Sequence, residues 1–102
     1  MPVTSFVMVS FGYKSGKAIQ VVSSQKMTAP GVSSISAPPA LGYKNPTVSF
    51  FGAGWFYFAI GQNPDATKDP RGFYDAGYSN GNGPWEIEVQ PGDKFSWAPT
   101  DP

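Results

Sequence analysis

The sequence "SFFGAGWFYFAIG", residues 49–61, contains two runs of strand-forming residues separated by Gly-Ala-Gly. Aromatic and β-branched side chains favour strands, whereas closely spaced glycines interrupt them. We therefore predict strands over residues 47–52 and 55–61. The glycines between them are expected to form a tight reversal or a β-bulge.

The strand predicted over 55–61 is apolar on both faces, because its side chains alternate between two sides. One face carries Phe56, Phe58 and Ile60, and the other carries Trp55, Tyr57 and Ala59. The first set is a core face. The second is covered either by loops of the same chain or by another subunit. Because soluble monomers rarely expose large apolar patches, we predict that Trp55 and Tyr57 mediate self-association into a homo-oligomer.

The composition favours short strands and many turns over helices. The 102 residues include 12 glycines and 11 prolines, and 14% are charged, against about 25% in a usual globular chain. Such a density of helix-breaking residues excludes long helices. We predict an all-β fold, a small antiparallel β-sandwich or jelly-roll-like barrel of about six to eight short strands.

Other strands and turns follow from local patterns along the rest of the chain. We predict a hairpin with strands at 3–11 and 17–24 and its turn at 12–16, and later strands at 32–36, 85–89 and 94–97. Pro-Gly-Asp at 91–93 predicts a type II turn with Gly92 at positive φ. A single helical turn fits only at 65–70.

The length and the missing residue types limit the class of protein. Residues 1–102 are expected to form one domain, with extended tails at 1–4 and 98–102. Seven basic and seven acidic residues give no net charge and no basic tract, so we expect no nucleic-acid partner. Cysteine and histidine are absent, which excludes disulfides and Cys/His zinc sites, and we expect no cofactor. No long apolar run is present, so neither a membrane span nor a signal peptide is expected.

The acidic residues of the segment 62–83 admit two interpretations. Asp65, Asp69 and Asp75 lie there in a long loop, with Arg71 between them. They belong either to a solvated loop with Asx turns or, for Asp65 and Asp69 together with backbone carbonyls, to a Ca²⁺ site. The spacing lacks the final Glu of an EF-hand loop, which favours the solvated loop.

Glu86 and Glu88 are the other carboxylates that a hydrolase could use. They alternate with Trp85, Ile87 and Val89 along one strand, so both point to solvent from the same face. A glycosidase needs two carboxylates across a cleft. The glycine-rich sequences Gly-Ala-Gly and Gly-Asn-Gly lack the lysine and the helix of a phosphate-binding loop. We therefore predict that the protein is not an enzyme.

The segment 62–83 also mixes rigid rings with adaptable polar groups, a combination that protein interfaces use. The candidate partner-binding residues are Asp69, Arg71, Phe73, Tyr74 and Tyr78. A second interpretation is a carbohydrate platform made of Tyr74, Tyr78 and Trp85 with Asp69, Asp75 and Asn80. A third is that these rings pin the loop to the sandwich.

Two segments, "FFGAGWFYFAIGQNPDAT" (50–67) and "WEIEVQPGDKFSWAP" (85–99), resemble the small β-sandwich structural proteins of tailed bacteriophages, among them capsid decoration (cement) proteins. The shared pattern is a glycine-flanked aromatic strand, a later short hydrophobic strand, a Pro-Gly-Asp turn and a final strand. The resemblance implies a virion protein that binds the outer surface of the assembled capsid as a trimer and stabilises contacts between major capsid proteins. It also implies synthesis in the bacterial cytoplasm. No family motif assigns a function to a particular residue.

Two alternative functions stay open at this point. One is a receptor- or glycan-binding module of a phage fibre or spike, which would bind purified sugar. The other is a β-sandwich adaptor with no link to a virion.

Overall fold

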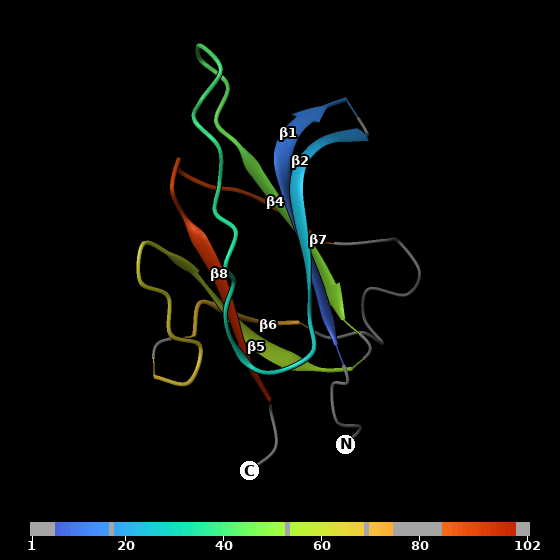
Figure 1. Ribbon diagram of the computed structural model, residues 1–102, viewed down its shortest axis with the longest axis vertical. Helices are drawn as coiled ribbons and strands as arrows, with labels where there is room; N and C mark the ends of the chain where they lie inside the picture. Colours follow the sequence, from blue (N-terminus) through green and yellow to red (C-terminus); the bar gives the residue numbers. More distant parts are fainter. Residues whose placement is uncertain (1–5, 17, 53, 69, 75–84, 100–102) are drawn as a thin grey trace.

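Two four-stranded antiparallel sheets pack face to face in the computed structural model, which describes residues 6–16, 18–52, 54–68, 70–74 and 85–99 (Figure 1). The strands are β1 (Val7–Ser15), β2 (Ala18–Met27), β3 (Gly31–Val32), β4 (Thr47–Gly52), β5 (Phe56–Gly61), β6 (Gly72–Tyr74), β7 (Trp85–Glu88) and β8 (Lys94–Pro99). The β1 sheet has the order β2-β1-β4-β7, and the β5 sheet has the order β3-β8-β5-β6. The predicted all-β sandwich is confirmed, and the described residues contain no helix, hence none that could cross a membrane.

The aromatic stretch at residues 49–61 supplies one strand to each sheet. β4 has the bounds predicted for it and β5 begins one residue late, but the two strands do not pair. The chain between them crosses from the β1 sheet to the β5 sheet, rather than forming a hairpin within one sheet. Gly52 allows this crossing, because a Cβ there would lie 2.6 Å from the Phe56 ring and 3.0 Å from the Phe6 carbonyl oxygen.

The core between the sheets is built mainly from aromatic rings. Phe50 of β4 lies at its centre, with ring centroids at 4.7 Å from Phe58 and 4.9 Å from Phe95. The rings of Phe56, Tyr74 and Trp85 lie within 6.4 Å of it. On the β1 sheet, Val7, Val9, Phe11 and Val48 complete the buried layer. One modest interior therefore accommodates many of the rings that make the sequence unusual.

The predicted hairpin forms, but its predicted turn at 12–16 is wrong. β1 continues through Ser15, and the chain reverses at Gly16, where φ is 63°. Gly12 instead lies inside β1 beside a β-bulge, where the pairing register with β2 shifts. A Cβ on Gly12 would lie 2.0 Å from the Gln20 carbonyl oxygen. This glycine is needed for close approach of two backbones rather than for a turn.

The edge strand predicted at 32–36 is regular only over β3. Beyond it, the Ser33 N–H donates to the Phe95 carbonyl at 2.6 Å, and the Phe95 N–H donates to the Ser33 hydroxyl at 3.0 Å. The Ala37 N–H then donates to the Asp93 carbonyl at 2.8 Å. Because a side-chain hydroxyl replaces a backbone carbonyl, the regular ladder ends although the segment still follows β8.

The predicted turn between β7 and β8 is confirmed. Gly92 has φ 85°, and the Asp93 N–H donates to the Gln90 carbonyl at 3.0 Å. β7 is one residue shorter than predicted and β8 is two residues longer. Ala98 and Pro99, which were expected in an extended tail, therefore belong to β8, and residues 1–4 and 100–102 lie outside the described residues.

The long loop predicted over 62–83 is interrupted by β6, which pairs with β5 at the edge of its sheet. Aromatic packing explains this short strand: the Tyr74 ring stacks on Phe56, with a centroid distance of 4.7 Å and an interplanar angle of 15°. Gly72 is required there, since a Cβ would lie 2.8 Å from the Phe58 ring. The helical turn expected at 65–70 is only a turn, closed by the Lys68 N–H and the Asp65 carbonyl at 3.3 Å.

Candidate binding surfaces

The outer face of the β5 sheet is partly covered by the segment 62–68, which we call the covering loop. The Ala66 N–H donates to the Ser96 hydroxyl at 3.1 Å, and this bond holds the loop on the sheet. Ala66 then packs on Ala59 and Ala98, which are buried as a small separate cluster. The inward assignment of Phe56 and Phe58 is confirmed, and part of the opposite face is covered by the chain itself.

The uncovered part of this outer face carries an aromatic pair. β6 places Phe73 directly opposite Tyr57, and the two rings make an edge contact with centroids 5.5 Å apart. Tyr57 is 39% exposed and Phe73 is 38% exposed. The exposed Arg71 precedes β6, and its backbone N–H donates to the Phe58 carbonyl at 2.7 Å, which fixes the start of this strand.

We call Tyr57, Phe73 and Arg71 the Tyr57 patch. Tyr57 was predicted for self-association, and Phe73 and Arg71 were predicted for partner binding. The sequence alone did not indicate that these three residues belong to one surface. Of the other candidates, Trp55 is half-buried, and Tyr74 is a core residue. Its burial leaves Tyr74 little surface with which to contact a partner.

The remaining predicted candidates of this segment divide into core rings and undescribed residues. Trp85 packs beside Tyr74, with ring centroids 5.0 Å apart, and belongs to the layer around the core. Tyr74 and Trp85 therefore pack against the sandwich, as the third interpretation of the sequence supposed for these rings. The other candidates lie outside the described residues: Asp69, Asp75, Tyr78 and Asn80.

Asp65 forms the Asx turn that the sequence predicted as one possibility. Its Oδ1 accepts hydrogen bonds from the Thr67 N–H at 3.0 Å and from the Thr67 hydroxyl. These bonds, the hydroxyl first, hold the pKa of the Asp65 carboxyl below its ordinary value of 3.8. Within the described part of the chain, no group of three or more Asp or Glu side chains is placed to hold a metal ion.

A projecting segment, residues 38–46, is the feature that the sequence did not predict; we call it the arm. Figure 1 shows the arm extending beyond the ends of the strands at the top of the view. Leu41 and Lys44 exchange two backbone hydrogen bonds of 2.9 Å, which close a two-residue turn at Gly42, with φ 62°, and Tyr43. Leu41 is 58% exposed, and Tyr43 is fully exposed. The signal in the sequence was Gly-Tyr between two strand-compatible residues, a two-residue hairpin pattern hidden among prolines.

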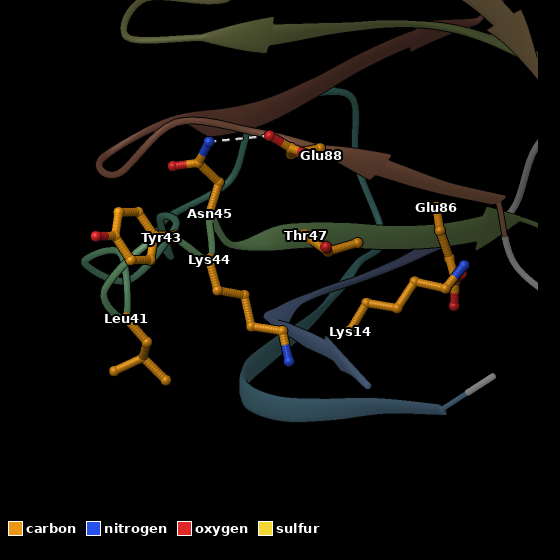
Figure 2. Close-up of a pocket in the computed structure, with 8 residues that line it drawn as sticks. All are labelled: Lys14, Leu41, Tyr43, Lys44, Asn45, Thr47, Glu86 and Glu88. Carbon is orange, nitrogen blue, oxygen red and sulfur yellow. Dashed lines mark hydrogen bonds and ion pairs between the residues drawn. The ribbon is translucent and has the colours of Figure 1, made fainter. Parts of the chain in front are cut away.

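An open groove of about 810 Å³ lies between the arm and the outer face of the β1 sheet (Figure 2). One wall is formed by the arm, with Leu41, Tyr43, Lys44 and Asn45, and the rest by Lys14 of β1, Thr47 of β4, and Glu86 and Glu88 of β7. One contact joins the arm to the sheet, and a second lies on the sheet side of the groove. The Asn45 amide donates to Glu88 at 2.9 Å, and Lys14 pairs with Glu86 at 2.7 Å.

The sequence predicted one property of the groove, which is that its two glutamates share one face of a strand. Glu86 and Glu88 do share the outer face of β7, as predicted, and they lie side by side rather than across a cleft from each other. Its two lysines and two glutamates make the lining neutral as a whole. Such a surface suits a polar or zwitterionic occupant better than a strongly charged one.

Comparisons with known proteins give no relative from which a role could be transferred to these surfaces. No family model matches the chain, and neither a curated protein nor a solved structure matches it. The Tyr57 patch, the arm and the groove are therefore the features from which a function can be inferred.

Proposed function

We propose that the protein is a virion structural protein that binds the outer surface of an assembled tailed-phage capsid and stabilises contacts between major capsid proteins. It acts as a homotrimer and is made in the bacterial cytoplasm. The observation that carries this proposal is the Tyr57 patch, an exposed aromatic pair beside an arginine on an outer sheet face. Tyr and Arg are the residue types most enriched where protein interfaces gain their energy.

The scaffold behind the patch supports a binding role. Phe73 lies on a strand whose neighbours Gly72 and Tyr74 are packed against Phe58 and Phe56, so its position is fixed before any partner arrives. A preorganised ring loses little conformational entropy on binding. A protein that binds only the assembled lattice shifts the equilibrium towards assembly by mass action. No chemistry beyond binding is required of the chain.

The proposal is tested by sedimentation with undecorated capsids. Wild-type protein is expected to pellet with them, and Phe73→Ala and Arg71→Ala are each expected to raise the apparent Kd by about tenfold. Phe51→Ala is the matched control, because Phe51 is also 38% exposed but lies on the β1 sheet. Its binding should equal that of the wild type.

Two outcomes would distinguish a wrong function from a wrong contact surface. If the wild type stays in solution but binds purified glycans, the protein is a receptor- or glycan-binding module instead. If the wild type pellets and both patch variants pellet equally well, the capsid role stands and the Tyr57 patch is not the contact.

A further inference from the structure

The arm is held rigidly at its base as well as at its tip. Pro46 is fully buried, and its carbonyl accepts the Val89 N–H at 2.9 Å. The buried Tyr13 donates its hydroxyl to the Pro39 carbonyl, and Asn45 is bonded to Glu88. Prolines also narrow the conformations available to the unfolded segment. The arm therefore projects Leu41 and Tyr43 in a fixed geometry.

A rigid projection with an exposed leucine and tyrosine contributes nothing evident to the core. Figure 2 shows both side chains on the arm side of the groove, with the Tyr43 hydroxyl directed away from the sheet. Burying the Leu41 and Tyr43 side chains against another surface would be favourable, because it removes apolar area from water. It would cost little conformational entropy, because the arm is already ordered. These properties are those of a binding element.

The charges around the arm indicate which surface would receive it. Lys44 lies on the arm and Glu88 lies on β7, so the two residues belong to opposite walls of one groove. Among the described residues neither forms an ion pair, whereas Lys14 and Glu86 are already paired with each other. An incoming segment that carries a lysine and two apolar side chains would thus find in the groove a carboxylate that accepts a hydrogen bond from Asn45 but forms no ion pair with a described residue. The arm itself has this composition.

We propose that the groove binds the arm of a second copy of this chain. Lys44 of one copy pairs with Glu88 of the other, and the Leu41 and Tyr43 side chains of the two arms pack together. Because the arm and the groove adjoin, each copy can give its arm to the next copy and receive an arm from the previous one, so that three copies can close into a ring.

This inference rests on the self-association in the proposed function, and it assigns that self-association to the arm rather than to Trp55 and Tyr57. The Tyr57 patch, on the other sheet, is then left available for the capsid. Light scattering coupled to size exclusion measures the mass directly. The wild type is expected at about three times 10.9 kDa at tens of micromolar.

Charge reversal tests the interface in a way that misfolding cannot imitate. Lys44→Glu and Glu88→Lys are each expected to reduce the mass to that of the 10.9 kDa monomer, and the double variant is expected to restore the oligomer. Lys26→Glu is the matched control, because Lys26 is an exposed lysine of the same sheet that pairs with Met8, far from the groove. Tyr43→Ala is expected to raise the dissociation constant by about tenfold. Circular dichroism confirms that each variant keeps its strand signal.

Each alternative outcome has a defined meaning. A monomeric wild type overturns the inference, as does an oligomer that survives both single reversals but dissociates in Tyr57→Ala. An arm-dependent dimer supports the inference and corrects the proposed trimer. If the arm variants are monomers that still pellet with capsids, capsid binding does not need the oligomer. If the wild type forms oligomers that never pellet with capsids, the arm inference stands and the proposed function fails.

Discussion

The outer faces of the two sheets differ in what limits the access of water to their small residues. The middle of the β5 sheet carries Ala59 and Ala98, and it is covered by a separate loop through Ala66. On the β1 sheet, β4 carries Thr47 and Ser49, each 7% exposed, and Thr47 lines the open groove beside the arm. There, long charged side chains at the rim, Lys14 and Glu86 among them, limit access to the small residues between them.

The difference follows from the residues that each face presents. Alanines that would be exposed to water gain from an apolar cover, whereas serine and threonine hydroxyls can be hydrated at little cost. A face of small polar residues therefore tolerates an open groove above it, and a face of small apolar residues favours a covering loop.

The largest effect is expected within β5, where inner and outer faces belong to one strand. Phe58→Ala should lower the free energy of unfolding by about 3–5 kcal/mol, because it empties a site in the aromatic core. Tyr57→Ala on the outer face should cost about 1 kcal/mol or less, the value of an exposed cross-strand pair. Urea denaturation measures both, and the reverse order would mean that the face assignment is shifted by one residue.

The second effect concerns the attachment of the covering loop. Ser96→Ala removes the acceptor of the Ala66 N–H, which leaves a buried donor unsatisfied and should cost about 1–3 kcal/mol. Ser24→Ala, at an exposed position of the β1 sheet, should cost less than about 0.5 kcal/mol. If equilibrium unfolding gives equal values for the two, the bond does not hold the loop.

The third effect tests the charged rim of the β1 sheet. A double-mutant cycle with Lys14→Ala and Glu86→Ala should give a coupling free energy of about 0.2–1 kcal/mol, because both side chains remain partly exposed and the solvent screens their attraction. The coupling should decrease as salt is added. A coupling well above this range, insensitive to salt, would show that the pair is more deeply desolvated than its exposure indicates.

The smallest effect is expected at the turn of the covering loop. Thr67→Val removes the hydroxyl donor, so the pKa of Asp65 should rise towards 3.8, which a carboxyl NMR titration measures. Because the folded-state pKa lies below that of the unfolded chain, the contribution of this turn is present at neutral pH and is lost as the pH falls below 3.8 through the folded-state pKa. An unchanged titration curve in the variant would exclude the hydroxyl as the main cause.

The elements that the sequence predicted well are those fixed by local chemistry. The alternation of Phe56 and Phe58 with Tyr57 determined the faces of β5, and Pro91-Gly92 determined the turn before β8. Both depend only on neighbours in the chain. The choice of sheet for β4 and β5 does not, because it depends on which distant strand each one pairs with.

The features that the sequence predicted wrongly or missed depend on contacts between residues that are far apart in the chain. Gly12 was interpreted as a turn glycine because its sequence context is that of a turn, but the Gln20 carbonyl opposite it is what requires the missing side chain. β6 is three residues long, too short for a period to be visible, and exists because Tyr74 stacks on Phe56. The arm escaped prediction because its prolines suggested an irregular segment, although they also fix its base. The Tyr57 patch could not be predicted as one surface, because its residues are brought together only by the pairing of β6 with β5.

The bulge in the hairpin has a consequence for the tendency of the protein to aggregate. β2 is the edge of its sheet, ten residues long, and a regular edge of that length is a template on which foreign strands can add. The register shift leaves Val22 without a direct partner, and such an irregularity twists the edge out of the plane that a docking strand would need. The interruption at Gly12 thus protects a neutral, weakly charged protein from aggregating through its longest strand.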